Sequence, residues 1–260
     1  MAGMIPMGDD FPTRRVPVVT YSLLAANVVV YLLSPGSLLA GWYGTAEERW
    51  CAYAVYIAQW GAIPQELFTG AQLDVGQLAL QGCPAEPFPK FVWFSLVSAM
   101  FLHGDAMHLL SNMLFLFAFG PSVEDLFGRV RYVLAYLLTG IAGTVGFALL
   151  SPEGTTPLIG ASGAVAGVLG AYLVLQPRAR MIGLLFGLVP IRLPGWVVAG
   201  SFFVIEYFRM VQDYLAPEIE RSAVAYSAHV FGFVAGVVAG VIGYRTRWWR
   251  VPGSVYDLRR

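Results

Sequence analysis

Long apolar runs separated by shorter polar segments organise this chain. Six of these runs are long enough, or nearly long enough, to cross a membrane as helices. They cover residues 16–33, 106–121, 132–150, 162–175, 195–211 and 224–244. A seventh run, residues 181–191, is too short to span and has an arginine at each end, so we expect it at the inner membrane interface.

The polar segments divide the chain into a membrane domain and its flanks. Residues 1–15 form an N-terminal segment, residues 16–245 the membrane domain, and residues 246–260 a C-terminal tail. Within the domain, residues 35–105 form a long loop between the first two runs. A signal peptide is the alternative for the first run. No small-x-small cleavage site follows it, however, so we interpret it as an uncleaved span.

The composition indicates a membrane protein. Hydrophobic residues make up 57% of the sequence and charged residues 12%, and the mean hydropathy is +0.65. A soluble domain carries about twice that charged fraction. We therefore predict an all-α fold, a polytopic bundle of six transmembrane helices in the lipid bilayer. The sequence has no basic stretch of the kind that binds nucleic acid, so no nucleic-acid partner is expected.

The basic residues are divided unevenly between the two sides of such a bundle. With the N-terminus inside, twelve of the sixteen basic residues fall on the inner side. Positive residues gather on the cytoplasmic side, so both termini are predicted to be cytoplasmic, in a bacterial inner membrane. Cys51 and Cys83 would then lie in the outer loop, where an oxidising compartment permits a disulfide. The sequence leaves open whether they are bridged or are two free thiols.

Ser162 is the first candidate for chemistry. It lies in the segment Gly160-Ala161-Ser162-Gly163, at the start of the fourth run. Gly163 and Gly167 form a small-xxx-small face, so the whole stretch has one interpretation as close helix packing. In the other interpretation Ser162 is a nucleophile, and the N–H groups of a helix start are available to an oxyanion.

Histidines inside the apolar runs favour the nucleophile. A polar side chain within a span usually faces the bundle interior, although a simple interhelical hydrogen bond is the alternative to a functional role. His229 lies sixteen residues before Arg245, and Ser162 lies sixteen before Arg178. Both therefore lie about 24 Å above the inner boundary. Gly232 would let the sixth helix close onto the fourth, so Ser162 and His229 could form a nucleophile–base pair.

Two further polar side chains approach the same level from the second helix. His108 and Asn112 are four residues apart, so they share one helix face. They enter from the outer end of the helix and could reach the depth of Ser162. There they would supply side-chain donors for a developing oxyanion.

These motifs in combination resemble those of the rhomboid family of intramembrane serine proteases. The matching segments are Gly160-Ala161-Ser162-Gly163, His103-Gly104-Asp105-Ala106-Met107-His108 continuing to Asn112, and Ala228-His229. Gly120-x-x-x-Glu124, Gly128 and Arg131-Tyr132 support them. The resemblance covers about residues 17–245.

The resemblance implies a serine endopeptidase with a role for each matched residue. Ser162 would be the nucleophile and His229 the general base, as a dyad without a third carboxylate. His108, Asn112 and the Ser162 backbone N–H would form the oxyanion hole. Structural residues near the site would be His103, Gly160, Gly163 and Gly232, and Glu124 matches an acidic residue near the inner end of the second helix.

The resemblance also implies a class of substrate. Membrane-anchored proteins would enter sideways near the fifth span and be cut in or next to their transmembrane segment, at a site open to the outer side. Glu206, within the fifth span, has two interpretations: an i,i+3 pair with Arg209, or a side chain that faces the cavity. Phe94 and Ser95 stand where the family often has a Trp-Arg pair, which leaves the anchoring of the first loop open.

Other classes of protein fit parts of the pattern. A transporter or channel would also have glycine-rich spans with polar groups, but no internal repeat is visible. A metal-dependent protease would need a zinc-ligand pattern such as HExxH, which the sequence lacks, so we expect neither a metal nor a cofactor. A catalytically inactive rhomboid-like protein that binds client transmembrane helices is the closest alternative. The presence of serine, histidine and both oxyanion side chains disfavours it.

Overall fold

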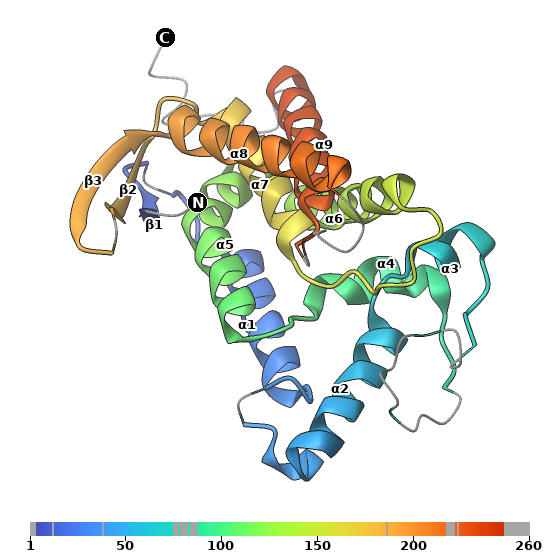
Figure 1. Ribbon diagram of the computed structural model, residues 1–260. Helices are drawn as coiled ribbons and strands as arrows, with labels where there is room; N and C mark the ends of the chain where they lie inside the picture. The colour runs from blue at the N-terminus through green and yellow to red at the C-terminus, as the bar shows by residue number, and fades with distance from the viewer. Residues whose placement is uncertain are drawn as a thin grey trace.

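A computed structural model describes residues 4–11, 13–37, 39–74, 78, 83, 88–185, 187–216, 222 and 224–246. Residues 247–260 of the predicted tail lie outside this range. The α-helices are α1 (Val18–Leu33), α2 (Ala46–Trp60), α3 (Pro64–Thr69), α4 (Ser95–Ser98), α5 (Ala106–Phe127), α6 (Arg129–Leu150), α7 (Ser162–Leu175), α8 (Gly195–Leu215) and α9 (Tyr226–Thr246) (Figure 1). Short 3-10 helices are η1 (Gly41–Tyr43), η3 (Val92–Phe94) and η4 (Ala99–Phe101).

Glycines let helices α6, α7 and α9 pack backbone to backbone. A Cβ atom added to Gly143 of α6 would lie 2.7 Å from the carbonyl oxygen of Ala228 in α9. A side chain at Gly232 of α9 would overlap the backbone of α7 at Gly163. Gly236 meets Gly167 one turn further along in the same way. The predicted close approach of the fourth and sixth spans is therefore confirmed.

Helix length separates the expected spans into two groups. Helices α5, α6 and α9 are long and apolar enough to cross a membrane. Helix α1, with 16 residues, and α7, with 14, are apolar but shorter. Helix α8 has 21 residues but carries Glu206, Arg209 and Asp213. The fold is a mostly helical bundle with several apolar helices, and the count of six spans stays a prediction.

The C-terminal end of α5 lies beyond the predicted run of residues 106–121. The helix continues to Phe127, so Glu124 and Asp125 lie within it. Glu124 is buried, and its carboxylate accepts hydrogen bonds from the backbone N–H groups of Val19 (3.0 Å) and Thr20 (2.8 Å). It thereby caps the first turn of α1, whose own N-cap residue forms no side-chain cap. The sequence pattern ends this helix too early because the partners of Glu124 and Asp125 lie in residues 14–20, far away in the sequence.

The expectation of an all-α fold is wrong in one respect, since the structure contains a small antiparallel sheet. Its order is β1 (Met4–Asp9), β2 (Arg180–Leu185) and β3 (Val189–Pro194). The hairpin β2–β3 occupies the short apolar run, and Gly187 has a φ of +74° between its strands. The N-terminal segment supplies β1. β1 pairs with β2 far away in the sequence, and β2 pairs with β3 in a local hairpin.

Asp9 joins the sheet to the C-terminal halves of two helices. Its carboxylate accepts hydrogen bonds from the hydroxyl groups of Ser122 in α5 (2.8 Å) and Tyr172 in α7 (3.0 Å). Burial raises the pKa of Asp9 above its ordinary value. The sheet is therefore attached to the helix bundle through α5 and α7.

The loop of residues 35–105 is largely folded, with α2, α3 and α4 in its described parts. Cys51 of α2 forms a disulfide with Cys83, with Cα atoms 5.2 Å apart. Of the two alternatives left by the sequence, the structure therefore contains the bridge. Its loop encloses residues 75–77 and 79–82, which lie outside the described parts of the chain.

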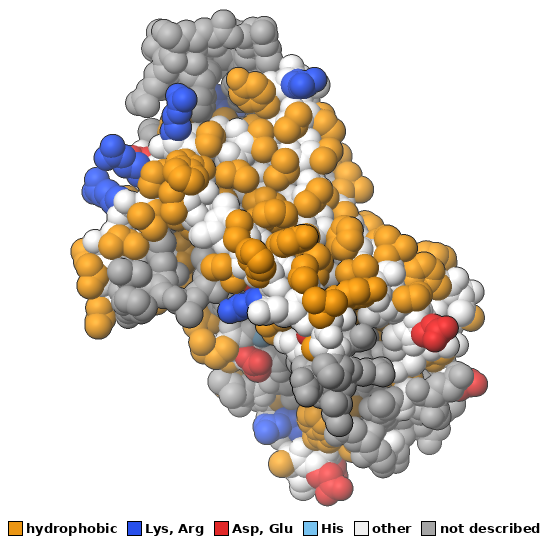
Figure 2. Space-filling model, turned by 45° about the horizontal axis from the view of Figure 1, so that its top comes forward, with side chains coloured by type: hydrophobic (Ala, Val, Ile, Leu, Met, Phe, Trp, Pro, Cys, Tyr) orange, Lys and Arg blue, Asp and Glu red, His pale blue; other side chains and the backbone are white. Residues whose placement is uncertain are grey.

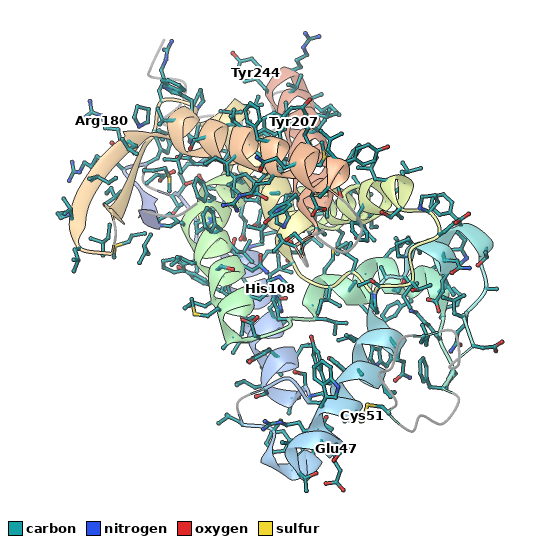
Figure 3. The ribbon with its side chains drawn as sticks, in the orientation of Figure 1. Glu47, Cys51, His108, Arg180, Tyr207 and Tyr244 are labelled. Carbon is teal, nitrogen blue, oxygen red and sulfur yellow. A yellow bond between two sulfur atoms is a disulfide. The ribbon has the colours of Figure 1, made fainter. Side chains whose placement is uncertain are left out.

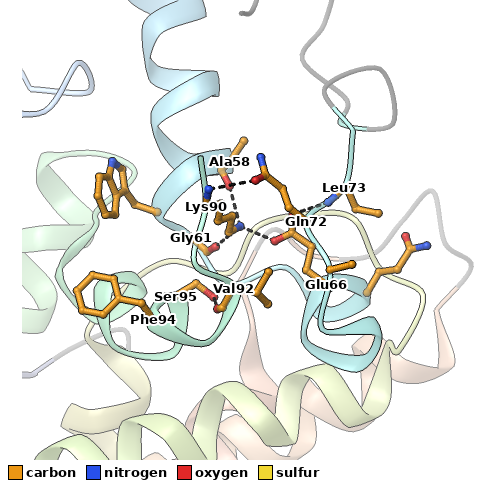
Figure 4. Close-up of polar contacts among 12 residues, drawn as sticks. Ala58, Gly61, Glu66, Gln72, Leu73, Lys90, Val92, Phe94 and Ser95 are labelled. Atoms are coloured by element: carbon orange, nitrogen blue, oxygen red, sulfur yellow. Dashed lines mark hydrogen bonds and ion pairs between the residues drawn. The ribbon is translucent and has the colours of Figure 1, made fainter. Parts of the chain in front are cut away.

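A buried ion pair holds the same loop together (Figure 4). Lys90 Nζ lies 2.6 Å from Glu66 Oε2, and the two side chains are 1% and 0% exposed. The ammonium group also donates to the carbonyl oxygens of Ala58 (2.7 Å) and Gly61 (2.8 Å), which uses all three of its protons. Burial lowers the pKa of Lys90, and the interaction with Glu66 opposes this shift. This pair anchors the loop close in sequence to Phe94 and Ser95, where the Trp-Arg pair is missing.

Polar and apolar surfaces are segregated. Figure 2 shows hydrophobic side chains over the middle of one face, basic side chains gathered toward its upper end and acidic ones toward its lower end. Figure 3 shows Arg180 and Tyr244 at one end of the molecule and Glu47 and Cys51 at the other, with His108 between them. The broad apolar band suits a lipid environment.

Candidate active site

Ser162 is the first residue of α7, and backbone hydrogen bonds hold the loop that precedes it in place. Leu158 exchanges two backbone hydrogen bonds with Ala62, at 2.8 and 3.0 Å, and the Gly160 N–H donates to the carbonyl of Ala99 at 2.8 Å. The N-cap residue Ala161 forms no side-chain cap. The N–H groups of the first turn of α7 therefore point beyond the helix without intrahelical acceptors, as an anion site requires.

Gly160 allows the backbone to pass close to His108. Its φ is +123°, a conformation that residues with a side chain rarely adopt. A Cβ atom there would lie 2.7 Å from His108 Nε2 and 3.6 Å from Ser162 Oγ. The imidazole of His108 in α5 and the hydroxyl of Ser162 in α7 therefore both lie close to Gly160. Any side chain at position 160 would intrude between them.

His108 presents a donor toward this point. Its Nδ1 accepts a 3.5 Å hydrogen bond from the backbone N–H of Gly104, so the proton of the neutral ring is assigned to Nε2. Asp105 caps α5 and accepts a hydrogen bond from the His108 N–H at 2.8 Å. The start of α5 thus fixes both the position and the tautomer of His108.

Asn112 and His103 lie beside His108. Asn112 is buried one turn further along α5, and within the described residues its Nδ2 has no hydrogen-bond partner. His103 is 2% exposed, with its ring 5.1 Å from that of His108 and edge-on to it. Burial lowers the pKa of His103 to about 4, so it is neutral at pH 7. The unsatisfied amide is a donor available to a ligand.

His229 approaches Ser162 through the contact between α7 and α9. Gly163, next to Ser162, is close enough to Ala228 that an added Cβ atom would lie 3.4 Å from the Ala228 carbonyl oxygen. Ser162 and Ala228 also line one cavity of about 10 Å³, room for roughly one water molecule. Among the described residues, no hydrogen bond joins Ser162 Oγ to His229. Catalytic hydrogen bonds are often long before substrate binds.

His229 has a partner that the sequence does not predict. Nδ1 of His229 lies 2.6 Å from Glu206 Oε2, and the side chains are 14% and 6% exposed. The expectation of a base without a carboxylate neighbour is therefore wrong. Glu206 also has an ion pair with Arg209, at 3.8 Å, so one of its two predicted interpretations is observed and the bond to His229 is added.

Other features of the chain lie apart from this site. The Cys51–Cys83 disulfide belongs to the loop of residues 35–105. A larger cavity of about 420 Å³ lies in the same loop, between Trp60 and Phe94, and none of its lining residues belongs to the site. In the part of the chain that the structure describes, no cluster of three or more His, Cys, Asp or Glu side chains could hold a metal ion.

Fold and site together define a helical membrane protein with a serine, histidines and an amide converging between its helices. Residues 90–246 match the family model of the Rhomboid domain, so the chain belongs to the rhomboid family. With its several apolar helices, it is an integral membrane protein.

Curated relatives share this region. The rhomboid protein YdcA of Bacillus subtilis is 30% identical over 145 residues, 55% of this chain and 64% of the relative. The rhomboid protease GluP of Bacillus subtilis is 41% identical over 92 residues, 35% of this chain and 18% of GluP. Rhomboid protein 1, mitochondrial, of Saccharomyces cerevisiae is 29% identical over 151 residues, 56% of this chain and 40% of the yeast protein. The chain thus matches less than two thirds of each relative.

Proposed function

We propose that the protein is an intramembrane serine endopeptidase that hydrolyses peptide bonds in or next to transmembrane segments of membrane-anchored proteins. One observation carries the proposal. Ser162 begins an uncapped helix next to the backbone of α9 that bears His229, while His108 and Asn112 approach from α5. Nucleophile, base and oxyanion donors are thus within one small region. Membership of a family with relatives named as proteases supports the proposal.

In the proposed reaction, Ser162 Oγ attacks the carbonyl carbon of the scissile bond, and its proton passes to His229. The tetrahedral intermediate collapses, the C–N bond breaks, and His229 returns the proton to the leaving amine. Water then adds to the acyl carbon while His229 takes one of its protons. That proton goes to Ser162 Oγ as the ester bond breaks, which restores the enzyme.

The negative oxygen of each intermediate needs donors that are already oriented. The Ser162 backbone N–H, Nε2–H of His108 and Nδ2 of Asn112 supply them. Donors held in a site that excludes bulk water stabilise a developing charge more than water does. The unpaired Nδ2 of Asn112 fits this role, since a buried donor without a partner is costly unless a ligand satisfies it.

Substrates would reach the site from within the membrane, beside α8. Phe202 and Phe203 of this helix contact Phe233 of α9, with ring centroids 6.2 and 4.9 Å apart. These are contacts between apolar side chains, and a lateral displacement of α8 would break them together with the contact between Glu206 and His229. Substrate segments with small or helix-breaking residues would unwind most easily at the site.

A fluorophosphonate probe tests the nucleophile directly. Such probes form a covalent bond with an activated serine, so wild-type protein in detergent should be labelled, with the adduct on Ser162 by peptide mass spectrometry. Ser162→Ala and His229→Ala should not be labelled. Ser201→Ala, which removes a hydroxyl on α8, is a matched control and should react at the wild-type rate. Labelling of folded Ser162→Ala would reject the proposal, and absence of wild-type labelling would favour an inactive client-binding protein.

A further inference from the structure

Glu206 is a carboxylate buried at the middle of α8, in a largely apolar helix bundle. Its side chain is 6% exposed, and its Oε2 lies 2.6 Å from Nδ1 of His229 on the neighbouring helix. Helix α8 lies across α9 at this point (Figure 1). An ionisable residue within a membrane bundle is expensive, so its presence and its partner call for an explanation.

The contact determines which nitrogen of His229 is free. A carboxylate only accepts hydrogen bonds, so the Nδ1 atom that it contacts carries a proton. Neutral His229 is then protonated on Nδ1 and has its lone pair on Nε2. This is the tautomer that a general base facing a serine hydroxyl requires.

We propose that Glu206 is a positioning residue for His229, which makes the catalytic unit Ser162, His229 and Glu206. This inference rests on the proposed protease function. Glu206 holds the imidazole in the Nδ1–H tautomer and pairs with the imidazolium that forms when Nε2 takes the proton of Ser162. The proton on Nδ1 stays on Nδ1 throughout, so Glu206 takes part in no transfer.

The surroundings of the pair keep the carboxylate oriented toward His229. Nη1 of Arg209 lies 3.8 Å from the other carboxylate oxygen, Oε1. The Arg209 side chain is 43% exposed. The guanidinium also lies 5.6 Å from the ring centre of Tyr226, whose ring is 6.4 Å from that of His229. Phe202 covers the imidazole with its ring centroid 6.3 Å away. Oε1 and Oε2 thus have separate partners, and the imidazole packs between aromatic rings.

A simple tie between α8 and α9 is the alternative role for this contact. A tie would hold the proposed substrate gate shut, so its loss would change how large substrates enter but not how Ser162 reacts. A positioning residue would instead govern the reactivity of Ser162 toward any electrophile. A small probe that does not need the gate separates the two roles.

The test compares Glu206→Gln with Asp213→Asn, the same chemical change two turns further along α8. Both variants should keep the wild-type melting behaviour in detergent. For Glu206→Gln, the fluorophosphonate labelling rate and kcat for a transmembrane substrate should both fall by at least about 10²-fold, since loss of the carboxylate of a catalytic triad costs up to about 10⁴-fold elsewhere. KM should stay within about threefold of wild type. Asp213→Asn should match wild type in all three.

Glu206→Asp keeps the charge with a shorter reach and should label faster than Glu206→Gln but at least about tenfold slower than wild type. The comparison of Glu206→Asp with wild type decides the question if the glutamine variant does not fold. Wild-type labelling by either Glu206 variant, with or without a change in KM, would overturn the positioning role. That result would leave the protease proposal intact as long as His229→Ala is unreactive. Absence of labelling in wild type would instead contradict the protease proposal itself.

Discussion

Side chains from α5 and the backbone of α7 lie around the proposed oxyanion position, and a local constraint holds each of them there. Asp105 caps α5 and fixes His108, Gly160 lets the chain pass beside it, and Ala161 leaves the N–H of Ser162 uncapped. Asn112 contributes a buried amide whose nitrogen has no partner within the described chain. The donors therefore act in parallel, and loss of one leaves the others in place.

Asn112→Ala should lower kcat by roughly 10²–10³-fold and leave measurable cleavage, because one of several oxyanion donors is lost. His229→Ala should abolish cleavage, since it removes the base itself. Ser111→Ala, on the exposed side of the same turn, is the control and should retain wild-type kcat. The measurement is the initial rate of cleavage of a transmembrane substrate in proteoliposomes. Equal kcat in Asn112→Ala and wild type would exclude Asn112 from the oxyanion hole.

Most of the proposed site can be predicted from the sequence, but not all of it. Ser162 and His229 are paired because equal distances from Arg178 and Arg245 place them at one depth. Glu206 is also an ionisable residue within an apolar run, and such residues usually face the bundle interior. Arg209 at i+3 offers it a local partner, so the sequence alone does not indicate the contact with His229.

Among the elements, the small sheet is the one that the sequence pattern does not predict. One of its residues, Asp9, has a pKa that folding changes. Asp9 joins β1 to α5 and α7 through Ser122 and Tyr172. Burial raises the pKa of this carboxyl above 3.8, so the folded state binds its proton more tightly than the unfolded state does. The stabilising effect of that proton is complete below pH 3.8 and is lost as the pH rises through the folded pKa.

Asp9→Asn should therefore be more stable than wild type at pH 7 and indistinguishable from it near pH 3.5. The amide oxygen can still accept hydrogen bonds from Ser122 and Tyr172. Thermal unfolding in detergent at both pH values measures the difference, and Asp10→Asn controls for the loss of one negative charge. A greater loss of stability in Asp9→Asn at pH 7 than at pH 3.5 would contradict the assignment.

Sequence patterns predicted the helices well because apolar runs and glycines act locally. The bounds of α6, α8 and α9 lie within a few residues of the expected ones. The sheet was not predicted because β1 pairs with β2 far away in the sequence, and the short β2–β3 hairpin lies in an apolar run that resembles an interfacial segment. The extension of α5 to Phe127 was not predicted for a similar reason, because Glu124 caps α1, which lies far away in the sequence.

At the scale of the whole molecule, charge and covalent chemistry point to one orientation. Basic side chains such as Arg180 lie at the end of the molecule opposite Cys51, whose disulfide persists in oxidising compartments (Figure 3). We expect the sheet end to face the cytoplasm and the loop of residues 35–105 to face outward. The active site, at the start of α5 and α7, would then open to the outer side.

Reporter fusions test this orientation. A reporter active only in the cytoplasm should be active when fused after Arg260 and inactive when inserted between residues 60 and 80. Mass spectrometry without reduction should find Cys51 and Cys83 linked. The opposite reporter pattern, or two free thiols recovered from an oxidising compartment, would contradict the orientation.

The central claim is that Ser162 cleaves a peptide bond within or beside a membrane span. Its most direct test reconstitutes wild-type protein and Ser162→Ala in proteoliposomes with a membrane-anchored substrate that has small residues near its outer membrane boundary, and maps the products by mass spectrometry. Wild type should release two fragments that meet at one bond in or next to the span. The folded Ser162→Ala protein should release none. Cleavage by Ser162→Ala at the wild-type rate would contradict the account.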